Sequence, residues 1–390
     1  MLKRIRKNIL CSLLICLAGV TLLAAGQKEA KGNAPVKIGA ILSITGGASF
    51  LGAPEAQTLE MLVNEINAGG GIRGRKLEVI IKDSKGAPEN AISFARQLIE
   101  EEKVLAIIGP STSGETMSIK DICQEGKTIL LSCAAAETIV EPVASYVFKT
   151  PQKDSYAAQR IYAVMKEKGI KRIGVVVSND GFGTGGKAQL EKYAPESGIE
   201  IAIAEVYDKE STDLTSVLTK IRDRNVQAVV NWSIVPAQSI IAKNMKQLGM
   251  DIPLFQSHGF GNIKYVTAAG EAAEGIIFPC GRLLVADVLP ADHPQKALLV
   301  KYNKDYSTKY GEDASTFGGH AYDALMILLE ALKRSGSAEP EKVRAAIETI
   351  KNFPGTGGIF NFSATDHNGL DINSFEMLTV KNGRFVLYKQ

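Results

Sequence analysis

Three consecutive hydroxyl side chains, Ser111, Thr112 and Ser113, stand between a strand-like and a helix-like segment. The first backbone N–H groups of a helix have no partner within the helix, and together with the helix dipole they favour an anion. Hydroxyl groups add donors of adjustable direction. The pattern predicts a site for an anionic group such as a carboxylate, although capping of the helix alone explains the same three residues.

Three glycine patterns resemble nucleotide-binding loops. Gly69–Gly74 follows a helix and precedes a strand, the reverse of the order in a dinucleotide-binding unit. Gly109–Gly114 is followed by Glu115 where a phosphate-binding loop has lysine, and a carboxylate there would repel phosphate. Gly181–Gly186 lies between a strand and a helix, but Ser178–Asp180 separate the strand from the first glycine. We interpret Gly181–Gly186 as a loop between lobes and keep an exported NAD-dependent oxidoreductase as an alternative.

No other combination of residues indicates catalysis or a metal site. The sequence has no GxSxG, HExxH or CxxC motif, and its four histidines are scattered. His320 begins a helix-like segment and is expected to be structural, while His293 and His367 lie in polar loops. We therefore expect no catalytic residue, no metal and no cofactor.

These side chains must be positioned by a regular alternation of strand-like and helix-like segments. The alternation runs before and after Pro151 and predicts an α/β fold of parallel sheets covered by helices on both faces. The predicted strands are Val36–Leu42, Leu77–Ile81, Val104–Ile108, Thr128–Ser132, Arg172–Val177, Glu200–Val206, Ala228–Trp232, Pro253–Gln256, Gly357–Phe362 and Ser374–Tyr388. The predicted helices are Pro54–Asn67, Asn90–Glu101, Gly114–Cys123, Ser155–Lys168, Gly183–Tyr193, Asp213–Arg224, Ala237–Leu248, Pro294–Tyr310, Thr316–Arg334 and Pro340–Ile350.

The N-terminus has the pattern of a secretory signal peptide. Four basic residues within positions 3–7 precede an uncharged apolar run, 9–25, that is shorter than a membrane span. Gln27 follows the small residues where a bacterial lipoprotein would carry cysteine. We predict a signal peptide over residues 1–26 and a free protein in the periplasm.

The mature chain is a near-neutral globular protein of two-domain size. The full sequence has 390 residues, which is more than one hydrophobic core usually supports. It is 45% apolar and 22% charged. Removing the signal leaves 41 of the 45 basic residues against 42 acidic ones, so nucleic-acid binding is not expected. Three cysteines remain, so at least one thiol is free unless it pairs between chains, and a Cys123–Cys133 disulfide is possible.

Five segments resemble the branched-chain (Leu/Ile/Val) amino-acid-binding proteins of bacterial ABC importers. They span the mature chain in the family's order, and they are Ile38–Leu42, Asn64–Ile72, Gly109–Ser111, Ala269–Gly275 and Ser315–Ala324. The resemblance implies a type I periplasmic binding fold, in which two doubly wound lobes joined by three crossovers close on a ligand. It implies an N-terminal lobe of residues 35–150 plus 282–353 and a C-terminal lobe of residues 151–281 plus 354–390.

The resemblance also implies the positions of ligand-binding residues. The family's carboxylate-holding segment falls on Ser111, Thr112 and Ser113. The next loop falls on Ser132–Ala136, where the family uses a backbone carbonyl near Ala134 and, for amino acids, a threonine hydroxyl at the position of Ala136. Aromatic residues that cover the ligand fall on Phe50 and Phe182, and a further lining position falls near Trp232.

The acidic residue that pairs with the ligand's ammonium in this family falls on His258. A buried ammonium needs acidic or carbonyl partners, and His258 and Ala136 remove two of them. A histidine can instead donate to an oxygen of the ligand, and its charge would favour an anion. We therefore expect an apolar carboxylate without an amine, such as an aromatic acid or 2-oxo acid. The alternative is that His258 points away and another acid, such as Asp180, takes the ammonium.

The resemblance implies a monomeric solute-binding protein without enzymatic activity, which delivers a small carboxylate or amino acid to an inner-membrane ABC permease. An extracytoplasmic sensor for a signalling receptor is the alternative from another class, since the same fold serves both. Because no apolar segment follows Gln390, we expect transport rather than signalling.

Overall fold

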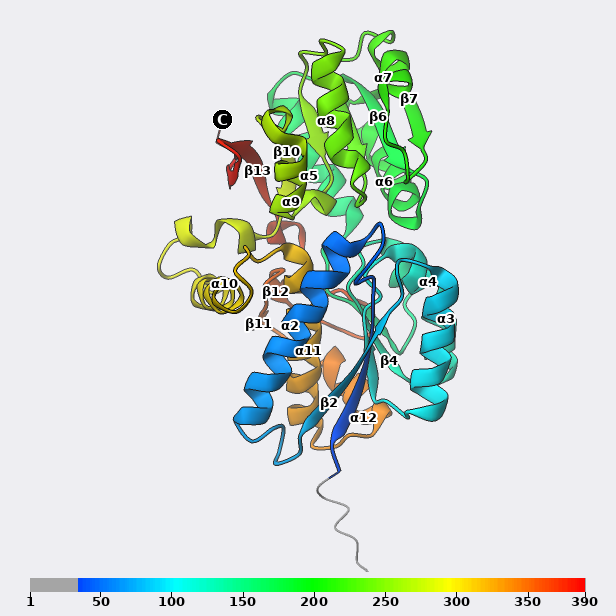
Figure 1. Ribbon diagram of the computed structural model, residues 1–390, viewed down its shortest axis with the longest axis vertical. Helices are drawn as coiled ribbons and strands as arrows, with labels where there is room; N and C mark the ends of the chain where they lie inside the picture. The colour runs from blue at the N-terminus through cyan, green and yellow to red at the C-terminus, as the bar shows by residue number, and fades with distance from the viewer. Residues whose placement is uncertain (1–33, 390) are drawn as a thin grey trace, which may run out of the picture.

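The computed structural model describes residues 34–389 as two α/β lobes stacked along the long axis of the molecule (Figure 1). The predicted signal peptide, residues 1–26, lies outside the described residues. Among the helices that the structure describes, none is both long enough and apolar enough to cross a membrane.

The first lobe is built on a five-stranded parallel sheet of order β2-β1-β3-β4-β5. Its strands are β1 (Val36–Leu42), β2 (Leu77–Asp83), β3 (Ala106–Ile108), β4 (Ile129–Ser132) and β5 (Val147–Lys149). One face is covered by α2 (Ser49–Ala68), α11 (Thr316–Ser335) and α12 (Pro340–Glu348), the other by α3 (Pro88–Arg96) and α4 (Ser113–Glu125). Ile38 and Leu42 enter the first of these cores and Ile41 the second, so burial on both faces explains the uninterrupted apolar strands.

The second lobe has a seven-stranded sheet of order β14-β13-β10-β9-β8-β6-β7. Five strands are parallel: β6 (Arg172–Ser178), β7 (Glu200–Tyr207), β8 (Ala228–Trp232), β9 (Leu254–Gln256) and β10 (Ile277–Cys280). The hairpin β13 (Glu376–Lys381) and β14 (Arg384–Leu387) adds antiparallel to β10. The helices of this lobe are α5 (Asp154–Glu167), α6 (Gly181–Ser197), α7 (Thr215–Arg222), α8 (Ala237–Gln247) and α9 (Ile263–Ala269).

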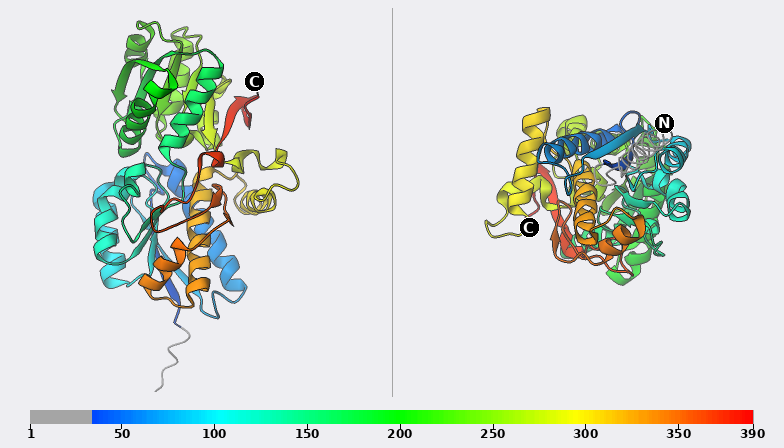
Figure 2. Two further views of the ribbon diagram at one scale, coloured as in Figure 1. Left: turned by 180° about the vertical axis from the view of Figure 1, so that it is seen from behind. Right: turned by 90° about the horizontal axis from the view of Figure 1, so that it is seen from below.

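The remaining elements are short or peripheral. Helix α10 (Lys296–Tyr310) stands beside the junction of the lobes, as the views in Figure 2 show, and packs on Met61 of α2 through Leu299 and Tyr302. A small antiparallel pair is formed by β11 (Phe353–Pro354) and β12 (Ile359–Phe360). The short helices are η1 (Gln97–Glu101), η2 (Glu137–Ile139), η3 (His258–Phe260), η4 (Gly270–Ala273), η5 (Arg282–Val288) and η6 (Ile372–Ser374).

The chain passes between the lobes in three places, after β5, after β10 and between Leu370 and Phe375. The third passage corrects the predicted boundary at 353/354. Phe360 and Phe362 stack with ring centroids 5.5 Å apart, and both belong to the first lobe's core. The strand-like pattern of residues 357–362 therefore reflects burial in the first lobe, where β12 pairs only with β11, and not a strand of the second sheet.

Candidate functional site

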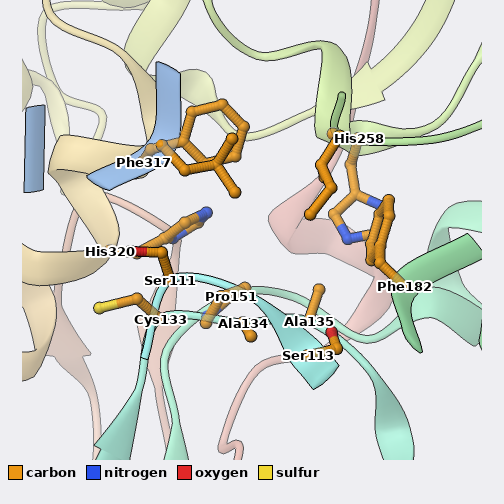
Figure 3. A pocket seen from close by; sticks show the side chains of 13 residues that line it. Ser111, Ser113, Cys133, Ala134, Ala135, Pro151, Phe182, His258, Phe317 and His320 are labelled. Atoms are coloured by element: carbon orange, nitrogen blue, oxygen red, sulfur yellow. The ribbon is translucent and has the colours of Figure 1, made fainter. Parts of the chain in front are cut away.

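A small cavity of about 20 Å³ lies between the lobes, where loops following β3, β4, β5, β8 and β9 meet (Figure 3). This volume has room for about one water molecule. The lining residues are Leu51, Ser111, Ser113, Cys133, Ala134, Ala135, Pro151, Phe182, Ile234, His258, Gly259, Phe317 and His320. The carboxyl ends of strands in two facing α/β lobes are the expected place for a ligand.

Two of the three predicted hydroxyl donors are already used within the first lobe. Ser111 donates its hydroxyl proton to buried Glu55 and accepts a hydrogen bond from the Ser43 N–H group. Thr112 caps α4 and donates to Glu115 Oε2 over 2.6 Å. Burial raises the pKa of Glu55 well above its usual range, which favours the neutral form of this carboxyl. In this structure Ser111 and Thr112 donate within the first lobe, and the prediction that they donate to a carboxylate stays a prediction.

Ser113 retains a free hydroxyl proton on the cavity wall. Its Oγ accepts a hydrogen bond of 3.3 Å from Ala136 N–H, which leaves the hydroxyl hydrogen available. As the first residue of α4, Ser113 also places its own N–H group among those that helix geometry leaves without a partner. Of the three hydroxyls predicted to bind an anion, Ser113 is therefore the one whose proton is free in this structure.

The loop after β4 positions this wall through its backbone. Ser132 Oγ accepts a hydrogen bond of 3.1 Å from Ala134 N–H, and it also bonds Thr116 in α4. Ser132 and Ala136 themselves do not line the cavity, whereas Ala134 and Ala135 do. The predicted loop therefore lies at the cavity, and hydrogen bonds of Ser132 and Ala136 hold its shape.

The second lobe presents a histidine enclosed by aromatic rings. The centroid of the His258 ring lies 5.4 Å from that of Phe182, 5.7 Å from Trp232 and 5.5 Å from Phe375, all edge to face. Burial lowers the pKa of His258 well below its usual value, and the charge of Lys149 adds to this. His258 therefore points into the site as expected, but as a neutral imidazole, which corrects the expectation of a charge that attracts an anion.

A buried acid that the sequence interpretation missed lies behind His258. Asp154 is the first residue of α5 and is completely buried, and its Oδ1 lies 3.5 Å from His258 Nε2. Because His258 is neutral, this contact is not an ion pair. Burial raises the pKa of Asp154 to about 7, and the nearby Lys149 ammonium opposes that shift. Asp180, the acid considered instead, caps α6 by accepting from the N–H groups of Phe182 and Gly183.

Lys149 is a buried cation that joins the loop after β4 to the first crossover. Its Nζ donates to the carbonyl groups of Ala135, Pro151 and Gln152 over 2.7–3.1 Å. Burial lowers its pKa to about 8. This ammonium is fully occupied by carbonyl groups, so it stabilises the junction and is not available as a direct partner for the ligand.

The aromatic positions are only partly where they were predicted. Phe182 lines the cavity, but Phe50 does not; its ring packs 5.2 Å from that of Tyr265 in the other lobe. Helix α2 begins at Ser49, before the predicted start at Pro54, and this helical turn directs Leu51 to the cavity instead. Trp232 is completely buried behind Phe182 and does not line the cavity.

Helix α11 contributes two lining residues that were not predicted, Phe317 and His320. Figure 3 shows both side chains on the wall opposite His258 and Phe182. Burial lowers the pKa of His320 to about 3, so it is neutral. The sequence does contain a signal for these two residues, because an aromatic residue and a histidine near the start of a helix can reach the cleft. The start of the helix alone, however, explains both residues equally well.

The glycines of Gly181–Gly186 serve close packing. A Cβ atom at Gly183 would overlap the Ser178 backbone at the end of β6, and one at Gly186 would overlap the indole of Trp232. Gly181 lies against the start of α4, so the two helix N-termini approach one another across the cleft. These contacts account for the glycines without a nucleotide.

Cys133 offers a thiol whose reactivity should report on ligand binding. Cys123, Cys133 and Cys280 are all free and buried, so the possible Cys123–Cys133 disulfide is not formed. Burial raises the pKa of Cys133 well above its usual value, which keeps the thiol neutral. Because Cys133 alone of the three lines the cavity, we expect a bound ligand to slow its alkylation selectively. Mass spectrometry of the native protein with and without ligand tests this, and equal protection of Cys123 and Cys280 would contradict it.

Comparisons with known proteins agree with this architecture. The sequence profile of the periplasmic binding protein family matches residues 35–384. The leucine-, isoleucine-, valine-, threonine- and alanine-binding protein of Pseudomonas aeruginosa is 24% identical over 87% of this chain and 89% of its own length. An extracellular ligand-binding receptor from Rhodopseudomonas palustris HaA2 superposes with a TM-score of 0.86 and 27% identity, covering 91% of this chain and 99% of the receptor.

A third comparison extends the range of ligands found in this fold. The solute binding protein of an ABC transporter from Rhodopseudomonas palustris BisB5, in complex with 3,4-dihydroxybenzoic acid, has a TM-score of 0.78. At 20% identity over 90% of this chain and 95% of that protein, it shows the fold alone. With the profile match over nearly the whole described chain, the protein belongs to the periplasmic binding protein family, and the relatives that it resembles are substrate-binding proteins and not enzymes.

Proposed function

We propose that this protein is the periplasmic substrate-binding component of an ABC importer, which captures a small apolar carboxylate between its lobes and delivers it to an inner-membrane permease. The observation that carries the proposal is the cavity itself. One wall offers the Ser113 hydroxyl and the start of α4 to an anion, and the facing wall offers Phe182, Ile234 and neutral His258 to an apolar group.

We further propose that the ligand lacks an α-ammonium group. An ammonium needs acceptors, and Ala136 supplies no side-chain oxygen, while neutral His258 offers one acceptor nitrogen in place of a carboxylate. Asp154 is the acid beside the site, and the Lys149 ammonium already interacts with it electrostatically. The Pseudomonas relative is named for amino acids and the Rhodopseudomonas BisB5 protein holds an aromatic acid, so both ligand classes belong in the test.

Thermal unfolding of the mature protein, stripped of carried ligand by unfolding and refolding, tests both statements. We expect benzoates or 2-oxo acids to raise the melting temperature, because a ligand at 100 times its Kd stabilises the folded state by about 2.7 kcal/mol. Leucine, valine and phenylalanine serve as matched compounds that carry the ammonium. Stabilisation by these amino acids alone would contradict the amine-free ligand, and no stabilisation by any carboxylate would contradict the binding function.

A further inference from the structure

Five buried side-chain polar atoms of His258 and its neighbours in the second lobe have no hydrogen-bond partner in the described part of the chain. They are Asp154 Oδ1 and Oδ2, both ring nitrogens of His258, and Trp232 Nε1. Asp154 and Trp232 are completely buried, and His258 is only 7% exposed. Buried polar groups are nearly always paired because an unpaired one is costly. The cluster therefore calls for a polar partner that is not part of the protein.

The three side chains converge from separate elements. Asp154 begins α5, Trp232 ends β8 and His258 follows β9. His258 connects the cluster to the cavity that it lines, since its Nε2 lies 3.5 Å from Asp154 Oδ1 and its ring centroid 5.7 Å from that of Trp232. On the side of α6, Gly185 lies near Asp154 Oδ2 and Gly186 against Trp232 Nε1. Gly185 and Gly186 therefore place no polar side chain against these atoms, although the Gly186 backbone packs on the indole.

The chemistry of the cluster matches a hydroxyl group. An ionised Asp154 only accepts hydrogen bonds, Trp232 Nε1 only donates, and a neutral His258 does one of each. A hydroxyl both donates and accepts, so it satisfies either kind of group. An ammonium only donates, would leave the Trp232 N–H unpaired, and would add a second positive charge beside the Lys149 ammonium that already faces Asp154.

We propose that Asp154, His258 and Trp232 form a subsite for a hydroxyl group of the ligand, so that the substrate class is a hydroxylated aromatic carboxylate. This inference rests on the proposed function. The carboxylate lies at Ser113 and the start of α4. The ring lies against Phe182, Phe317 and Ile234, which line the cavity. Its hydroxyl meets His258, which lines the cavity; Asp154 and the indole N–H lie behind His258 and Phe182, so the hydroxyl reaches them as these rings shift to admit the ligand.

Calorimetric titration with benzoate, the three monohydroxybenzoates and their methoxy analogues tests the subsite. We expect one hydroxybenzoate to bind about tenfold more tightly than benzoate or more. Its methoxy analogue, which cannot donate, should lose the gain. Asp154→Ala should abolish the gain while changing the Kd for benzoate less than about threefold. Trp232→Phe, which keeps a ring but removes the N–H, should reduce the gain.

Glu137→Gln provides the matched control, because Glu137 is a neighbouring acid that accepts from Ser155 and does not line the cavity. It should leave the preference for hydroxybenzoate unchanged. Equal affinities for benzoate and all hydroxybenzoates would overturn the subsite while leaving the binding function intact, and so would a uniform loss of affinity in Asp154→Ala. Binding of leucine or phenylalanine that requires Asp154 would identify an ammonium subsite and overturn the hydroxyl. Binding of no carboxylate would overturn the proposed function as well.

Discussion

Replacing Gly186 by alanine should destabilise the second lobe and abolish ligand binding. Alanine is normally favoured over glycine within a helix by about 1 kcal/mol, so the sequence alone predicts a gain in stability. At Gly186, however, the added Cβ would overlap Nε1, Cδ1 and Cε2 of Trp232, which is completely buried. Overpacking of this kind costs about 1–3 kcal/mol and sometimes more.

The loss of binding follows because the indole cannot move independently of the site. Its ring centroid lies 5.9 Å from that of Phe182 and 5.7 Å from that of His258, and both of these residues line the cavity. A displaced Trp232 would therefore displace two walls of the binding site. Urea denaturation measures the change in stability, and calorimetric titration with a carboxylate measures the change in affinity.

Gly185→Ala is the control on the same helical turn. A Cβ at Gly185 would make ordinary contacts, 3.4 Å from Asp154 Oδ2 and 3.6 Å from the Ala136 Cβ. This variant should gain up to about 1 kcal/mol from helix propensity, so the two neighbouring substitutions should change the urea midpoint in opposite directions. Equal stability of Gly186→Ala and the wild type would show that the indole shifts freely.

The fold could be predicted because its strongest determinants are local. In β1, Ile38 and Leu42 face one layer of helices and Ile41 the other, so a strand buried on both sides reads as an uninterrupted apolar run. The order of such runs and helices implies parallel sheets. The two-lobed α/β architecture predicted in this way agrees with the structure and with its relatives.

The position of the third passage between lobes could not be predicted, because it depends on which lobe buries Phe360 and Phe362 in its hydrophobic core. Phe360 and Phe362 are apolar in a strand-like pattern, which either lobe could accommodate. Their position is decided by tertiary contacts, including the edge-to-face packing of Phe362 on Phe148 at 6.0 Å. Local patterns carry no information about a partner more than 200 residues away.

The sequence predicts which segments line the site. It does not predict which way each side chain points or how burial changes the charge of a side chain. Leu51 faces the cavity in place of Phe50 because a shift of one residue turns a helical side chain by about 100°. Asp154 was missed because an acid at the start of a helix is ordinarily explained by the helix dipole. The neutrality of His258 results from its burial, and burial of a loop residue is known only once the lobes are assembled.

Replacing Ser113 by alanine should weaken carboxylate binding by about 10- to 100-fold. Of the three hydroxyls after β3, Ser113 alone keeps its proton free of a side-chain acceptor, since Ser111 donates to Glu55 and Thr112 to Glu115. A hydrogen bond to a charged group contributes about 1.5–3 kcal/mol, which corresponds to this loss of affinity. Calorimetric titration with benzoate or a 2-oxo acid gives the measurement.

Ser111→Ala separates this role from a general effect of losing a hydroxyl. It removes the partner of the buried Glu55 carboxyl and of the Ser43 N–H group, so we expect a loss of about 1–3 kcal/mol in stability. Because the Ser111 proton never reaches the ligand, the affinity of the folded protein should change much less than in Ser113→Ala. Equal losses of affinity in the two variants would mean that the Ser111 proton turns from Glu55 to the ligand on binding. The originally predicted group of three donors would then describe the bound state better than the division of roles argued from the structure.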